Sequence, residues 1–207
     1  MASRIFASHF GHLSLVSAWL SASFFGGARY SNYMAWLADP FTVKPAAQIV
    51  YAGVNHIQDA VNGEVGAGSS GMRVTSGAFQ AWRAAGLVSS EQLFAVSIAC
   101  LTFALVLLVA GWFHHHKAMP TTAWFNDVDA ILSHHLTAVV GLGCLAWAGH
   151  LVHVAVPTDA LLRLGVDPEG LGLGVNPFSL AVQGSILDEA GAGFMSLDWR
   201  SLGQQVT

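Results

Sequence analysis

The sequence predicts an all-α integral membrane protein with three transmembrane helices. Three apolar stretches, residues 5–25, 93–113 and 131–156, contain no Asp, Glu, Lys or Arg, and all six prolines also lie outside them. About 20 apolar residues suffice for an α-helix to cross a bilayer. Charged residues make up only 10% of the chain, against about 25% in soluble domains, and the mean hydropathy is +0.54.

The first stretch, residues 5–25, carries His9 and His12 one helical turn apart near its start. A basic start before an apolar run is also typical of a signal peptide, but this run is longer than a usual cleavable core. We therefore interpret it as a retained spanning helix. A long Gly-rich connection follows, over residues 26–90. Within it, residues 78–86 are expected to form a short surface helix that ends at a glycine.

The second and third stretches are joined by a short polar loop, which predicts an antiparallel helix pair. The second stretch ends in three consecutive histidines, residues 114–116. The third has His134 and His135 at one end and His150 and His153 at the other. The 18 steps from His135 to His153 span about 27 Å and return to the same azimuth, so both imidazoles share a helix face.

Three spans of alternating direction sort the ten histidines into two layers. The start of the first span, the end of the second and the start of the third face the same side of the membrane. Seven histidines fall in that layer and three in the other. The first layer holds His9, His12, His114, His115, His116, His134 and His135, and the second holds His56, His150 and His153.

Imidazoles inside a membrane span indicate a functional site, although a hydrogen bond to a neighbouring helix is the commonest use of a single one. Zinc requires four converging ligands, often Cys or carboxylate, and none lies near the histidines. The two cysteines, Cys100 and Cys144, lie within apolar spans and are interpreted as core residues. Adjacent His134 and His135 favour planar metal cofactors that take one axial ligand each, such as magnesium chlorins. A bis-histidine haem-b cytochrome and a His-lined transporter remain alternatives.

Catalytic and nucleic-acid functions have little support in the sequence. The spans contain no carboxylate for proton relay, and the chain has no CxxC motif. The net charge of −4 gives no basic patch of the kind that nucleic acids require.

Several segments resemble, in order, the N-terminal part of the PsaA/PsaB family of photosystem I core subunits, and its PsaA branch in particular. They include RIFASHFGHL, GARYSNYMAWLADP, KPAAQIV, TSGAFQAWRAAG, AGWFHHHK and HHLTAVVGLGCLAWAGHLVHV. The resemblance runs from about Arg4 to about Asp167. Family members have eleven membrane helices, and this chain matches the first three, which belong to the antenna domain.

The resemblance implies ten positions that bind chlorophyll a, with β-carotene nearby, and its histidines would be axial ligands to magnesium. Two departures are Gly26, where the family has a histidine ligand, and His115, where it has a tyrosine. Gln58 is an alternative to His56. The implied ligands are His9, His12, Gln48, His56, His114, His116, His134, His135, His150 and His153.

The resemblance also implies the organisation of the chain in a multi-pass thylakoid protein of plastids or cyanobacteria. Residues 1–156 would be a three-helix antenna portion with a lumenal connection at 26–90, and residues 157–207 a lumenal tail. The seven-histidine layer would be stromal. The piece itself would be non-catalytic within a light-driven plastocyanin or cytochrome c–ferredoxin oxidoreductase.

The expected partners are the rest of PsaA on another chain, PsaB, small photosystem I subunits and membrane lipids, with no nucleic acid. Phylloquinone and the 4Fe-4S clusters would be held by other chains. The missing helices would come from a partner chain, because the sequence resembles only the start of the family.

Overall fold

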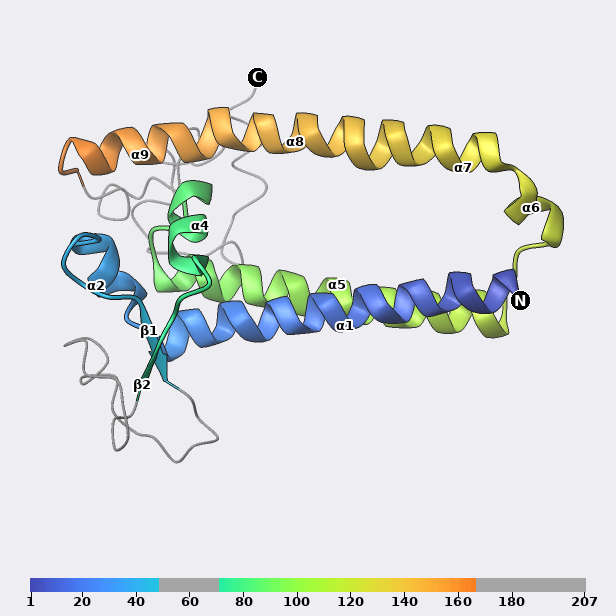
Figure 1. Cartoon of the computed structure of the whole chain (residues 1–207), viewed down its shortest axis with the longest axis horizontal. Helices are drawn as coiled ribbons and strands as arrows, with labels where there is room; N and C mark the ends of the chain where they lie inside the picture. The colour runs from blue at the N-terminus through green and yellow to red at the C-terminus, as the bar shows by residue number, and fades with distance from the viewer. Residues whose placement is uncertain (49–70, 167–207) are drawn as a thin grey trace, which may run out of the picture. The chain divides into compact units, whose positions relative to one another are not determined.

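The computed structural model describes residues 1–48 and 71–166 (Figure 1). His56 and the greater part of the predicted tail therefore lie outside the described residues. The chain divides into two compact units, Met1–Ala146 and Trp147–Thr207, and each is described by itself. Helices dominate the described residues, as the sequence predicts, and one short antiparallel sheet is added to them.

Two long helices, α1 (Ala2–Arg29) and α5 (Ser90–His116), lie side by side in the first unit (Figure 1). They are antiparallel, since Ser14 bonds to Ala104 while Ser21 bonds to Ser97. Both helices extend beyond the uncharged stretches that predicted them. The start of α5 is set by Ser89, whose hydroxyl accepts a hydrogen bond from the Gln92 amide at 3.2 Å.

Serines join α1 to α5 through buried hydrogen bonds. The Ser14 hydroxyl donates to the Ala104 carbonyl at 2.7 Å. Ser21 and Ser97 exchange a reciprocal pair, each hydroxyl 2.8 Å from the other residue's carbonyl. In an apolar environment such bonds hold helices together where lipid offers no alternative partner. Near the end of α5, Gly111 lets the α1 backbone approach, because a Cβ there would be 3.3 Å from the Ala7 carbonyl oxygen.

Two helices among the described residues are long and apolar enough to cross a membrane, Ser90–His116 with 27 residues and Val128–Arg163 with 36. Helix α1 has 28 residues but does not join them. Its serines and histidines lower its hydropathy, and two of the serines, Ser14 and Ser21, bond to α5. The third membrane span stays a prediction.

A small cap lies in the connection between α1 and α5. It contains α2 (Tyr33–Ala38), β1 (Ala46–Gln48), β2 (Gly71–Arg73) and α4 (Ala78–Ala85). The two strands pair antiparallel, with Ala47 opposite Met72. The predicted short helix is confirmed as α4, and Gly86 ends it at φ 91°, a left-handed conformation that favours glycine.

Asn32 ties α2 to the sheet. Its side-chain nitrogen donates to the Lys44 carbonyl at 2.8 Å, and its side-chain oxygen accepts from the Ala46 amide at 2.7 Å. The side chain is buried and uses both ends of its amide, so no polar group is left unsatisfied there. The sequence did not predict this sheet, because strands of three residues have no readable alternation.

An aromatic core fills the cap. Tyr33, Trp36, Phe79 and Leu93 are buried together, and Trp82 packs against them. Phe79 thus places one face of α4 in the core, so α4 is not simply a surface helix. Gly27 of α1 lies so close to Trp82 that a Cβ would come within 2.5 Å of the indole. Each aromatic pair adds about 0.5–1.5 kcal/mol beyond the burial of its area.

The chain then continues through α6 (Thr122–Asn126), α7 (Val128–His134), η2 (His135–Leu142), α8 (Gly143–His150), η3 (Leu151–Ala155) and α9 (Val156–Arg163). Asp127 caps α7, accepting from the Ala130 amide at 3.1 Å. The segments η2 and η3 have π-helical bonding. The helix continues past the expected end at residue 156 and through Pro157, whose missing N–H is accommodated directly after the π-helical turn of η3.

We predict that Tyr33→Phe destabilises the cap by about 1 kcal/mol at neutral pH, because the hydroxyl donates to the Leu87 carbonyl at 2.6 Å. Burial raises the pKa of Tyr33. The ordinary pKa of a tyrosine is about 10. Because the pKa is higher in the folded state, the protonated phenol contributes its full stabilisation below about pH 10, and this contribution is lost as the pH rises above that value. The difference between wild type and Tyr33→Phe should therefore shrink above about pH 10.

Thermal unfolding of the chain in detergent, followed by near-ultraviolet circular dichroism, measures this difference. Tyr30→Phe is the matched control, because Tyr30 is exposed. A pH-independent difference between Tyr33→Phe and wild type would contradict the assignment.

Candidate cofactor-binding site

The predicted ligands occupy the ends of the long helices. His9 and His12 are exposed on α1, and the three histidines of residues 114–116 end α5. His134 and His135 lie at the junction of α7 and η2. The predicted loop ligand Gln48 is the last residue of β1, and His56 lies outside the described residues.

His150 ends α8 and His153 lies within η3, both in the second unit. The ring of His150 is stacked on that of Trp147, with centroids 4.9 Å apart and an angle of 10° between the planes. This stacking restrains the plane of the His150 ring. His153 is exposed.

Three imidazoles are fixed by hydrogen bonds from Nδ1 to a backbone carbonyl. The distances are 2.8 Å for His134 to Ala130, 2.7 Å for His135 to Ile131 and 3.1 Å for His114 to Ala118. A carbonyl oxygen can only accept, so Nδ1 must carry the proton in each ring. The lone pair then remains on Nε2, which is the state that binds a metal, and the ring orientation is set by the backbone.

The adjacent His134 and His135 do not form a shared site. Successive helical residues are about 100° apart around the axis, and each of these rings bonds to the carbonyl of its own preceding turn. Among residues 1–48 and 71–166, no group of three or more His, Cys, Asp or Glu residues is placed to hold a metal ion.

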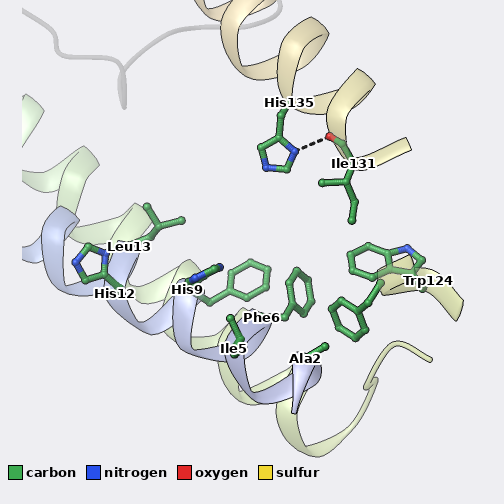
Figure 2. A pocket seen from close by; sticks show the side chains of 11 residues that line it. Ala2, Ile5, Phe6, His9, His12, Leu13, Trp124, Ile131 and His135 are labelled. Carbon is green, nitrogen blue, oxygen red and sulfur yellow. Dashed lines mark hydrogen bonds between the residues drawn. The ribbon is translucent and has the colours of Figure 1, made fainter. Parts of the chain in front are cut away.

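A cavity of about 660 Å³ opens between α1 and the segment from α6 to η2 in the first unit. Figure 2 shows the His135 ring extending from its helix into this space, and the dashed line marks its hydrogen bond to the Ile131 carbonyl. The volume falls within the range of about 300–1,000 Å³ that small-molecule and cofactor sites occupy. The lining is mainly apolar but includes three imidazoles. The lining residues are Ala2, Ile5, Phe6, His9, Phe10, His12, Leu13, Trp124, Phe125, Ile131 and His135.

Aromatic side chains form one end of the cavity, around Phe6 (Figure 2). The Phe6 ring lies 5.0 Å from Phe10, 5.2 Å from Trp124 and 5.6 Å from Phe125, all in edge-to-face geometry. His114 joins this cluster, stacked on Phe10 at 5.3 Å. The cluster brings the end of α5 against the start of α1, as the antiparallel arrangement predicts.

Sequence reasoning did not single out this aromatic wall. Two of its members, Trp124 and Phe125, lie in the polar loop before the third span, where apolar residues have no helical periodicity to assign them. The only available signal was two large aromatic residues in a loop that is otherwise polar.

A family model described as "Photosystem I psaA/psaB protein" matches residues 1–206, which is essentially the whole chain.

We predict that Phe6→Ala lowers the free energy of unfolding by about 2 kcal/mol, below the usual core range because the ring is only half-buried. The loss should come from the four ring contacts that Phe6 makes with Phe10, His114, Trp124 and Phe125. Denaturant unfolding of the chain in detergent micelles measures the change. Phe41→Ala, which removes a fully exposed ring, is the control, and equal effects of the two substitutions would contradict the role of the wall.

Proposed function

The chain belongs to the photosystem I psaA/psaB family, and on this premise we propose that it is an N-terminal, PsaA-type portion of a photosystem I core subunit that binds chlorophyll a and β-carotene. Members of this family are core subunits of photosystem I, a light-driven oxidoreductase complex of the thylakoid membrane. Two apolar helices of 27 and 36 residues fit a membrane protein. We propose α1 as the third span.

The observation that carries the proposal is the state of the imidazoles. His114, His134 and His135 each donate from Nδ1 to a backbone carbonyl and keep the Nε2 lone pair available. A chlorophyll magnesium takes one such axial ligand, so each of these rings could hold a pigment by itself. The proposed axial ligands are His9, His12, His114, His116, His134, His135, His150 and His153.

Gln48 and His56 complete the proposed set on the resemblance alone. Gln48 lies in β1, whose pairing with β2 holds its backbone within the cap. We propose that His9, His12 and His135 serve the cavity of the first unit, whose lining is otherwise made of apolar side chains.

Bound chlorophyll supplies absorption of visible light and transfer of excitation energy. The contribution of the chain is to hold each ring at a fixed place and orientation. Backbone hydrogen bonds fix the imidazoles, the serine contacts fix α1 against α5, and the aromatic wall closes one end of the cavity. We propose that the piece serves as antenna and does not itself transfer electrons.

The proposed partners are the remaining part of PsaA, PsaB and small photosystem I subunits. The assembled complex would carry electrons from a lumenal donor to ferredoxin, with phylloquinone and 4Fe-4S clusters held by other chains. The exposed apolar side chains of η2 and α8, such as Val139 and Leu145, are suited to contact lipids or other subunits.

We predict that His135→Leu removes one chlorophyll a per purified photosystem complex and that His134→Leu removes a different one. The double variant should therefore lose two, since each ring binds through its own ligand. Pigment extraction, normalised to protein by quantitative mass spectrometry, measures the loss.

Thr137→Leu is the matched control, because it places leucine in the same turn without removing an imidazole, and its pigment count should equal that of the wild type. An unchanged count in His135→Leu would contradict that ligand. A pyridine haemochrome signal in stoichiometric amount would replace the proposal with a haem protein.

A further inference from the structure

His115 is the one histidine of the cluster at the end of α5 that the ligand set does not use. Its ring is half-buried, and its Nδ1 is buried without a hydrogen-bond partner among the described residues. The preceding residue, His114, has the opposite arrangement, with Nδ1 bonded to the Ala118 carbonyl. Two neighbouring imidazoles in one helix end therefore have different environments.

The environment of Nδ1 determines which nitrogen of His115 carries the proton. A buried N–H without an acceptor carries the full desolvation penalty of a lost hydrogen bond, and orphaned buried N–H groups are rarer than unpaired acceptors. The favoured neutral tautomer of His115 thus has a bare Nδ1 and a proton on Nε2. Because the ring is only half-buried and its Nδ1 is enclosed, Nε2 is the nitrogen that a ligand can reach.

A protonated Nε2 donates a hydrogen bond but has no lone pair to offer a metal. This excludes His115 from the role proposed for His114, His134 and His135, although all four are histidines at helix ends. The ring of His115 lies against that of His116, with centroids 4.7 Å apart and an angle of 89°. The donor is therefore next to a proposed axial ligand.

We propose that Nε2–H of His115 donates a hydrogen bond to a ring-carbonyl oxygen of a chlorophyll bound at this end of α5, an inference that rests on the proposed function. A neutral donor suits a neutral carbonyl, whereas an anionic lipid headgroup is better served by the adjacent ammonium of Lys117. That ammonium lies 6.0 Å from the centre of the Trp112 ring. His115 is then a residue that orients the pigment and tunes its absorption, rather than a ligand.

The test compares assembled photosystem complexes that carry His115→Phe, which removes the donor, and His115→Tyr, which keeps an aromatic ring and an O–H donor. Two measurements are made on each, the chlorophyll a count per complex and the carbonyl-stretching bands in the resonance Raman spectrum. His116→Leu is the matched control for loss of a ligand.

We expect His115→Phe to retain the wild-type pigment count while one hydrogen-bonded carbonyl band moves to the higher frequency of a free carbonyl. His115→Tyr should keep that band at low frequency, and His116→Leu should lose one pigment. Loss of one chlorophyll in His115→Phe would overturn the inference, because it would make His115 a ligand. Unchanged carbonyl bands would also overturn it, and a loss of bound lipid in that variant would assign the donor to a headgroup.

A second measurement decides the question where His115→Phe does not assemble. In complexes labelled with ¹⁵N-histidine, the solid-state NMR signals that disappear in His115→Tyr should be those of a ring protonated on Nε2. Signals from an Nδ1-protonated, metal-bound ring would overturn the inference. Neither result changes the pigment counts of the His134 and His135 variants, so failure here is distinct from failure of the proposed function.

Discussion

The hydrogen bond from an imidazole Nδ1 to a carbonyl of its own helix is the interaction on which the proposed site depends. At His134 and His135 this bond joins each ring to the carbonyl four residues earlier, at 2.8 Å and 2.7 Å. It fixes both the proton and the ring plane without a second side chain. On the proposed function each histidine is an independent metal ligand, so two can follow one another in sequence and still serve different cofactors.

In the rest of the first unit, polar side chains bond to backbone carbonyls and apolar side chains pack together or face outward. Ser14 and Ser21 of α1 satisfy their hydroxyls on α5, which leaves apolar side chains on the outward faces of the pair. Aromatic residues pack together at the two ends of the helix pair, around Tyr33 in the cap and around Phe6 beside the cavity. Ser14, Ser21 and Ser97 inside the helix pair therefore have partners on the facing helix.

Much of the helical part could be predicted from the sequence, because charged residues are absent from three long stretches and every helix end lies near a polar residue. The cap could not, since Tyr33 and Phe79 meet across more than 40 residues of chain and no local pattern links them. The helix that continues through Pro157 also escaped prediction, because a π-helical turn accommodates the proline. For the site, the ligand set inferred from the sequence stays a prediction, whereas the hydrogen bonds of the imidazoles and the aromatic wall required side-chain positions.

The most direct test of the central claim is a density map of the assembled complex at a resolution that shows the ring nitrogens through their contacts. We expect one planar macrocycle whose central metal faces Nε2 of His134 and a second one facing Nε2 of His135, with each Nδ1 still bonded to the carbonyl of Ala130 or Ile131. Rings turned so that Nδ1 faces the metal, or both imidazoles directed at one shared ion or at water, would contradict it.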